Sequence, residues 1–323
     1  MFSMIETTSI GIVIPYYNAA KHIVHVVEKA TRYADHIVII NDASPDTMPV
    51  EMLNTYQQVQ IINNKKNLGV GGATLKGIEV LIKNPEIKVI VKLDADDQMD
   101  TTFIPKLVQP ILNQHAHFVK GNRFRDLEAL KSMPTIRRFG NLFLSFLSKV
   151  STGYWNCFDF NNGFFAISSG TVLKLNTTAI SKNYFFETSL IGELYFQQAI
   201  IAEIPMPAIY GDEESNMKLF RMPWLFSINL FKKFITRIWK SYFVYDFNIG
   251  TVYLVFGVFL FLGGTIFGGY NWSVNSATNE LTPVGTIMIS TLLIILGFQL
   301  LLQAIQFDIL RTPTTFIKRE GQF

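Results

Sequence analysis

Two long stretches near the C-terminal end contain no charged residue, and they set the strongest limit on how this chain can fold. They cover residues 247–279 and 281–307. Each contains an apolar run long enough to cross about 30 Å of hydrocarbon as a helix. We therefore predict two transmembrane helices, over residues 249–269 and 284–307. The alternative is a buried hairpin in a soluble core, where two such long uncharged runs are rare.

Basic residues flank the outer ends of the two stretches and are absent from the segment that joins them. Four precede the first stretch: Lys232, Lys233, Arg237 and Lys240. Three follow the second, in or next to the tail 311–323: Arg311, Lys318 and Arg319. The connecting segment 270–283 has neither Lys nor Arg. The positive-inside rule then predicts an inner-membrane protein whose two termini and N-terminal domain are cytoplasmic.

The rest of the composition narrows the class of protein. Residues 1–6 show no basic region followed by an apolar stretch, so we expect no signal peptide. Cys157 is the only cysteine, which excludes an intrachain disulfide and fits a reducing compartment. The net charge of +3 is too small to indicate nucleic-acid binding, and we expect no nucleic-acid partner.

The N-terminal part, residues 1–218, alternates apolar runs with helical patterns. The runs cover residues 10–14, 37–40, 59–62 and 89–93, and Pro15 is expected to end the first. Continuous apolar strands separated by helices predict an α/β fold with a mostly parallel sheet covered on both faces. Ligands of such sheets bind beyond the carboxyl ends of the strands. Four polar residues fall at these exits: Tyr17, Asp42, Asn67 and Asp94.

The fourth apolar run ends in a group of oxygen ligands, Asp94, Asp96, Asp97 and Gln98. Mg2+ and Mn2+ prefer such ligands, take one or two protein carboxylates, and leave positions for water and phosphate. The pattern therefore indicates a metal held for a diphosphate. The alternative is an acidic loop in which Asp97 or Asp100 caps a helix over residues 103–112.

Glycines follow the third strand. Gly69, Gly71 and Gly72 lack the spacing of a dinucleotide-binding fingerprint, and no Walker lysine follows them. Two interpretations stay open. The loop lets the backbone approach a nucleotide near helix N-terminal amides, or it is a tight turn without a ligand.

Seven short motifs together resemble the family 2 glycosyltransferases, and among these dolichol-phosphate mannose synthase and bacterial polyprenyl-phosphate glycosyltransferases. They are PYYN (15–18), NDASPD (41–46), NLG (67–69), DADDQ (94–98), GNRF (121–124), RRFGN (137–141) and DFNNGF (159–164). The resemblance covers residues 9–218, and two C-terminal spans also fit bacterial members. It implies a GT-A fold, a Rossmann-like catalytic domain that binds a nucleotide sugar.

The resemblance also implies roles for individual residues. Donor-binding positions would be Pro15, Tyr17, Asn18, Asp42, Asn67, Gly69 and Asp94, with Asp42 accepting a base N–H. The ligands of Mg2+ or Mn2+ would be Asp94, Asp96 and Gln98. Arg123 and one of Arg137 or Arg138 would bind phosphate through guanidinium forks, although the two adjacent arginines also fit an ordinary solvated surface.

The chain departs from the family pattern at Ala19, Asn41, Phe165 and residues 209–218. The last of these segments lacks the arginine of the mannose synthases, so we take Ser215 and Lys218, with Arg123 and Arg138, as candidate contacts to an acceptor phosphate. These departures weaken the case for mannose, and we favour a UDP-sugar over a GDP-sugar.

The implied acceptor is a polyprenyl phosphate such as undecaprenyl or dolichyl phosphate. Its oxygen is largely ionised at neutral pH, because its second pKa is about 6, so no strong general base is needed. We expect inversion by single displacement, with Asp96 or Asp97 orienting the acceptor. Glu187 is a rival base, or a helix cap.

Residues 219–246 join the two parts. Their apolar face is Phe231, Phe234, Ile235, Ile238 and Tyr242, and their basic face is Lys233, Arg237 and Lys240. The pattern predicts amphipathic helices in the headgroup layer, divided at Pro223; a core helix on the sheet is the alternative.

In the second span of the membrane region 247–310, Gln299, Gln303 and Gln306 share one helical face. This arrangement predicts contact with the first span or with another subunit, and so allows a homo-oligomer.

We weigh three functions: transfer of a hexose to a polyprenyl phosphate, transfer to a lipid hydroxyl or growing glycan, and a non-enzymatic scaffold that binds nucleotide sugars. The second requires an identifiable base, and intact Asp94, Asp96 and Gln98 argue against the third.

Overall fold

In a computed structural model, the structure of the chain is described for residues 9–125, 135–207 and 222–314, with only the backbone for residues 125, 135–139 and 222–225. The chain divides into two compact units. The first is Met1–Phe234 with Pro313–Phe323, and the second is Ile235–Thr312.

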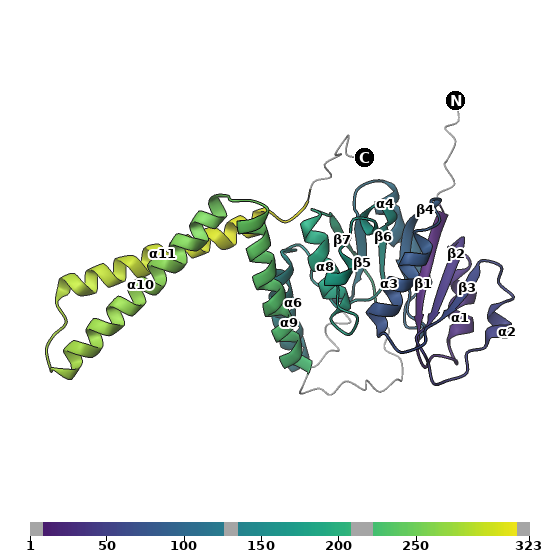
Figure 1. The fold of residues 1–323 in the computed structure, drawn as a ribbon, viewed down its shortest axis with the longest axis horizontal. Coiled ribbons are helices and arrows are strands. Elements are labelled where there is room, and N and C mark those ends of the chain that lie inside the picture. The colour runs from purple at the N-terminus through teal and green to yellow at the C-terminus, as the bar shows by residue number, and fades with distance from the viewer. Residues whose placement is uncertain (1–8, 126–134, 208–221, 315–323) are drawn as a thin grey trace, which may run out of the picture. The chain divides into compact units, whose positions relative to one another are not determined.

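The first unit is built on a seven-stranded sheet (Figure 1). Its strands are β1 (Ser9–Tyr16), β2 (His36–Asn41), β3 (Val59–Asn63), β4 (Ile87–Lys92), β5 (Phe118–Asn122), β6 (Phe165–Ser168) and β7 (Ile201–Pro205). Their order is β3-β2-β1-β4-β6-β5-β7, and β6 runs antiparallel to both of its neighbours. All other pairs are parallel, which confirms the predicted mostly parallel sheet.

Helices cover both faces of this sheet (Figure 1). On one face Ile12 and Ile14 pack with α1 (Ile23–Ala30) and α4 (Ile104–Leu112). On the other face Val13 packs with α3 (Val70–Leu81) and α8 (Phe186–Phe196). Neighbouring strand residues point to opposite faces, so strands buried on both sides must be apolar throughout. The remaining helices of this unit include α2 (Val50–Leu53), α6 (Thr135–Thr152) and α7 (Ser169–Val172).

Pro15 does not end β1, contrary to the prediction, because the strand continues to Tyr16. The carbonyl of Val13 accepts from Leu93, which follows β4, whereas the carbonyl of Tyr16 accepts from Asp42, which follows β2. Odd-numbered residues of β1 therefore direct their backbone N–H and C=O groups toward β4. Since β4 has already ended at Lys92, the N–H that Pro15 lacks would have had no partner in that strand.

The second unit contains two long apolar helices, α10 (Ile249–Ala277) and α11 (Val284–Leu310), which lie side by side (Figure 1). Their most apolar windows have mean hydropathies of 2.1 and 2.2 and are only 22% and 11% buried. Both helices are long enough to cross a bilayer. Their low burial is the opposite of what a soluble core hairpin would show.

The segment before these helices differs from the prediction in two ways. Pro223 does not divide it, because α9 (Met222–Trp239) is continuous and Pro223 lies in its first turn, where a helix needs no N–H donor. A π-helical turn, η4 (Lys240–Val244), follows. Two of the three residues of the expected basic face, Lys233 and Arg237, are also buried, and only Lys240 is partly exposed. In the first unit Lys233 is buried and paired with Glu193.

In the second unit Arg237 is 1% exposed and binds Asp308 through two hydrogen bonds of 2.6 and 3.0 Å. The hydroxyl of Tyr242 donates to the same carboxylate at 3.0 Å. Two apolar residues of α9, Phe231 and Ile235, are instead more than half or half exposed, at 65% and 50%. The helix thus buries Lys233 and Arg237, each paired with an acid, and leaves some large apolar side chains exposed.

Candidate active site

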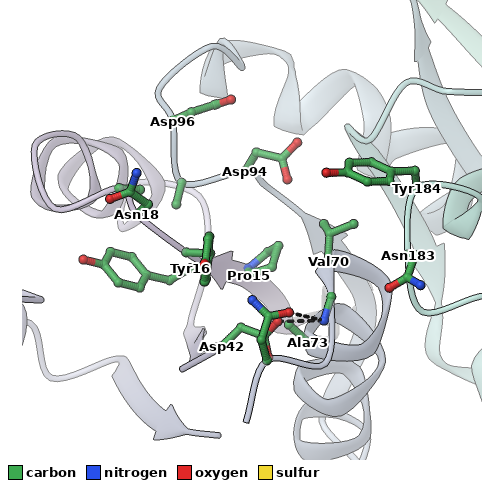
Figure 2. Close-up of a pocket in the computed structure, with 15 residues that line it drawn as sticks. Pro15, Tyr16, Asn18, Asp42, Val70, Ala73, Asp94, Asp96, Asn183 and Tyr184 are labelled. Atoms are coloured by element: carbon green, nitrogen blue, oxygen red, sulfur yellow. Dashed lines mark hydrogen bonds between the residues drawn. The ribbon is translucent and has the colours of Figure 1, made fainter. Parts of the chain in front are cut away.

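The loops that leave β1, β2, β3 and β4 line a cavity of about 400 Å³. All seven of the expected donor-binding residues line it: Pro15, Tyr17, Asn18, Asp42, Asn67, Gly69 and Asp94. Figure 2 shows Asp42 at the base of this cavity and Asp94 and Asp96 along its other side. Asn183 and Tyr184, which precede α8, complete the lining and had no signal in the sequence.

Asp42 ties the loop after β3 to the end of β2. Its Oδ1 accepts from the side chain of Asn64 at 2.7 Å and from the N–H of Leu68 at 2.8 Å. Its Oδ2 accepts from the N–H of Gly69 at 2.8 Å (Figure 2). A carboxylate oxygen can accept two hydrogen bonds. Oδ2 therefore keeps capacity for a ligand N–H at the wall of the cavity.

The three glycines allow close backbone packing beside this carboxylate. Gly69 has a φ of 81°, and a Cβ there would lie 2.6 Å from Asn183 Oδ1. A Cβ on Gly71 would lie 2.6 Å from the ring of Phe186. Gly69 lines the cavity, whereas the N–H groups of Gly71 and Gly72 both donate to the Lys182 carbonyl. Gly69 is thus the N-cap of α3 and part of the cavity wall, whereas Gly71 and Gly72 lie in the first turn of that helix and pack against the segment before α8.

Asp46 joins the loops after β1 and β2. Its Oδ2 accepts from the Ala20 N–H at 2.8 Å, and its Oδ1 accepts from the Ser44 hydroxyl. The oxygen of Ser44 in turn accepts from the Asn18 N–H at 2.7 Å. Burial alone would raise the pKa of Asp46, but these hydrogen bonds hold that pKa below its usual range. The cavity wall is therefore fixed by hydrogen bonds before any ligand binds.

A second cavity, of about 150 Å³, is lined by residues of the same acidic loop. Asp94 and Asp96 line both cavities. The second cavity adds Gln98 and Arg123, and also residues with no predicted role, among them Asn161, Asn162 and Met206. The two carboxylates therefore lie where the cavities adjoin.

The donor set of Asp94, Asp96 and Gln98 fits Mg2+ or Mn2+, because it offers two carboxylates and one amide oxygen beside open space. Oδ1 of Asp96 accepts from the Gln98 N–H at 3.1 Å, which folds the loop back on itself. Among the described residues, no group of three or more His, Cys, Asp or Glu side chains is arranged to hold a metal ion, so this set depends on the amide of Gln98.

A buried lysine lies directly behind this loop. Lys92 Nζ is 2.6 Å from Asp94 Oδ1 and 3.6 Å from Glu187 Oε1. A Cβ on Gly163 would collide with Lys92 Nζ and lie 3.1 Å from Asp94 Oδ2. Burial alone would lower the pKa of Lys92, but the two carboxylates outweigh it and raise that pKa. Burial raises the pKa of Glu187, whose side chain lines neither cavity.

Asp97 is not brought to the cavities. It has a φ of 60° and turns back to α1, where Lys29 Nζ lies 2.9 Å from Oδ1. His25 Nε2 lies 3.7 Å from its other oxygen. Asp97 therefore anchors the acidic loop to a helix. The helix cap expected here is supplied by Asp100, whose Oδ1 accepts from the Thr102 N–H at 2.9 Å.

Arg123 is held at the second cavity by a buried acid. Its Nε and Nη2 lie 2.8 and 3.0 Å from the two oxygens of Asp159, which is 2% exposed. Burial would raise the pKa of Asp159, but the Arg123 guanidinium and the buried Lys120 lower it. Glu203 completes the group, because its Oε1 accepts from the Phe158 and Asp159 N–H groups.

The side chains of four other expected residues lie outside the described part of the structure. Arg137 and Arg138 lie in the first turn of α6, where only the backbone is described. Ser215 and Lys218 lie outside the described residues. Of the family departures, Phe165 is fully buried against Phe118 and Phe186, so it belongs to the core.

Comparison with known proteins identifies the family of this chain. The family model of glycosyl transferase family 2 matches residues 11–174. A UDP-N-acetylglucosamine–dolichyl-phosphate N-acetylglucosaminyltransferase of Methanococcus voltae is 30% identical over 228 residues, which are 63% of this chain and 86% of that protein. A dolichol-phosphate mannosyltransferase of Pyrococcus furiosus is 27% identical over 125 residues, which are 35% of this chain and 34% of that protein.

Among solved structures, glucosyl-3-phosphoglycerate synthase of Mycobacterium tuberculosis in complex with UDP has a TM-score of 0.54 at 14% identity, over 72% of this chain and 80% of that one. The same enzyme with Mn2+, UDP-glucose and phosphoglyceric acid has a TM-score of 0.53 at 16% identity, with the same coverage. This likeness confirms the predicted GT-A fold. The chain belongs to glycosyl transferase family 2 and is a glycosyltransferase.

Proposed function

We propose that this glycosyltransferase moves a hexose from a UDP-sugar to a polyprenyl phosphate, with the help of a divalent cation, at the cytoplasmic face of a membrane. The observation that carries the proposal is the position of Asp94 and Asp96, which line both cavities. Two substrates that meet at one pair of carboxylates can react across them.

The first cavity suits the donor. Asp42 Oδ2 can accept a base N–H, and the half-exposed Tyr17 offers a ring beside the opening. The Methanococcus voltae relative is named for a UDP-sugar, which favours UDP here and makes N-acetylglucosamine the first sugar to test.

The residues that would hold the cation are Asp94, Asp96 and Gln98. When bound, Mg2+ or Mn2+ would neutralise the charge that develops on the departing nucleoside diphosphate. The chain's own residues provide the rest. Lys92 holds Oδ1 of Asp94, and the Gln98 N–H donates to Oδ1 of Asp96, so the chain itself orients both carboxylates beside the cavities.

The second cavity suits a phosphate acceptor. Arg123 lines it, and Asp159 fixes the plane of the guanidinium. A hydroxyl acceptor would need a carboxylate free to take its proton. The two candidate bases outside the cation site, Asp97 and Glu187, are both paired with lysines and line neither cavity. Asp100 does line the second cavity, but its Oδ1 caps the helical turn that follows it. This arrangement favours an acceptor that is already ionised, such as a polyprenyl phosphate.

The two apolar helices would anchor the enzyme in the bilayer that contains the lipid substrate. If α10 and α11 cross the bilayer, the catalytic unit stays at a surface where long-chain lipid phosphates are present. The basic residues that flank the two helices favour a cytoplasmic catalytic unit.

The test is a screen with membranes that contain the protein. Radiolabelled UDP-N-acetylglucosamine, UDP-glucose and GDP-mannose are each offered with a short polyprenyl phosphate or with the matching polyprenyl alcohol. We expect label in the organic phase from a UDP-sugar with the phosphate only. Transfer to the alcohol at an equal rate would replace this function with glycosylation of a lipid hydroxyl.

A further inference from the structure

Helix α11 has two opposite faces of different character. Its buried residues are Ser290, Gly297, Ala304 and Asp308. Gln299 lies nine residues after Ser290, and Gln306 lies nine residues after Gly297. Nine residues are about two and a half helical turns, so each glutamine points away from the buried face.

The buried face is occupied by α10. A Cβ on Gly297 would lie 2.7 Å from the Cα of Phe261, and a Cβ on Gly264 would lie 2.8 Å from the Cβ of Leu293. The two backbones are therefore in close contact through glycines. This contact excludes the first of the two predicted partners of the glutamines, because α10 covers the opposite side of α11.

The glutamine face, defined as Gln299, Gln303 and Gln306, lies on the outside of the hairpin. Gln299 and Gln306 are exposed and Gln303 is partly exposed. Within the described part of the chain, none of the three amides has a hydrogen-bonding partner. Leu292 and Ile295, which are 57% and 59% exposed, continue the same face in steps of three and four residues.

The depth of these amides makes their exposure costly if α11 spans the bilayer. Gln299 lies two residues past the middle of the helix, about 3 Å along its axis, so it is far from either headgroup layer. An amide that lacks partners in hydrocarbon loses the hydrogen bonds that it made in water. Such side chains are typical of contacts between membrane helices.

We propose that the glutamine face binds the same face of a second copy of this chain within the bilayer. Two copies inserted in the same direction bring each glutamine to the depth of its counterpart. An amide is both donor and acceptor, so it complements itself across a two-fold axis along the membrane normal. No other partner is guaranteed to offer amides at these three depths. The proposal rests on α11 crossing the membrane and not on the proposed sugar transfer.

Cysteine cross-linking in native membranes tests this contact. In a Cys157→Ala background, Gln299→Cys and Gln306→Cys are compared with Phe298→Cys and Ile305→Cys, whose parent side chains are 53% and 49% exposed on other sides of α11. We expect an oxidant to give disulfide-linked dimers at the glutamine positions and little at the controls. Equal cross-linking at all four positions, or none at the glutamine positions, would overturn the proposal.

A second measurement does not depend on disulfide geometry. The triple change Gln299→Leu, Gln303→Leu and Gln306→Leu keeps the helix apolar and removes the amides. We expect energy transfer between differently labelled copies in liposomes to show dimerisation weakened by about tenfold or more. Unchanged dimerisation, or a parent protein that is already monomeric, would refute the contact. Neither readout requires enzymatic activity.

Discussion

The two cavities that share Asp94 and Asp96 are built in different ways. The first is lined mainly by loops that leave neighbouring parallel strands, and short hydrogen bonds such as those of Asp42 and Asp46 join one loop to the next. The second is lined from segments far apart in the chain, and Arg123 reaches its place through Asp159, 36 residues away.

This difference separates two ways of making a site. The first cavity is a direct consequence of parallel strands ending at one edge of a sheet. The second depends on the antiparallel strand β6, because the segment just before it brings Asn161 and Gly163 to this cavity and Asp159 to Arg123. We expect changes at the shared carboxylates to affect both cavities, and changes elsewhere to affect one.

The largest effect is expected at the shared carboxylates. Asp96→Ala should lower kcat/KM for sugar transfer by about 10²–10³-fold or more, because a carboxylate that lines both cavities is lost. The matched control is Asp97→Ala. This change removes the adjacent carboxylate, which lines neither cavity. Equal losses in the two variants, measured with the radiolabel assay, would show that the loop matters only for its shape.

Asp42→Asn should act on the first cavity alone. One carboxylate oxygen becomes an NH2 group that faces the N–H of Leu68 or Gly69, so the loop loses an acceptor. We expect KM for the nucleotide sugar to rise by about tenfold or more, while KM for the lipid phosphate changes little. A rise in both constants would contradict the separation of the two cavities.

Gly163→Ala should disturb the support behind the acidic loop. The new methyl group would collide with Lys92 and crowd Asp94, at a cost of about 1–3 kcal/mol. Gly170→Ala is the control, because a Cβ at Gly170 meets no atom within 4 Å. Denaturant unfolding and Mn2+ titration of both variants measure the effect. Wild-type stability and Mn2+ affinity in Gly163→Ala would show that Lys92 does not need its observed position.

The smallest effect is expected at Asp159, and it depends on pH. Because the folded protein holds the pKa of Asp159 below its usual range, the stabilisation is complete above the unfolded value of about 3.9 and is lost as pH falls through the folded value. Asp159→Asn should cost about 1–2 kcal/mol at pH 7, discounted for the partly exposed Arg123.

The difference in unfolding free energy between Asp159→Asn and the parent should therefore shrink below pH 4. A difference that stays constant from pH 7 to pH 3 would show that the Asp159 carboxylate is not preferentially ionised in the folded state.

Much of the fold and of the first cavity could be predicted from the sequence, because local patterns carry that information. Strand exits placed Tyr17, Asp42 and Asp94 at one sheet edge, and they lie there. The predicted end of β1 at Pro15 was wrong. A proline fits there because no neighbouring strand needs its N–H on that side.

The remaining features depend on contacts that no local pattern encodes. Lys92 looks like an interruption of an apolar strand until Glu187 and Gly163 are brought beside it. Asp97 has the same sequence environment as Asp96, yet its positive φ directs it to Lys29. The buried face of α9 also differs from the prediction, because Glu193 and Asp308 pair with its basic residues Lys233 and Arg237.

The central claim is that a divalent cation held by Asp94, Asp96 and Gln98 joins a sugar nucleotide in one cavity to a lipid phosphate in the other. The most direct measurement is transfer of labelled sugar from the active UDP-sugar to polyprenyl phosphate, before and after a chelator and again after Mn2+ or Mg2+ is restored. The account predicts that the chelator abolishes transfer and that the added cation restores it. Undiminished transfer with the chelator present would contradict it.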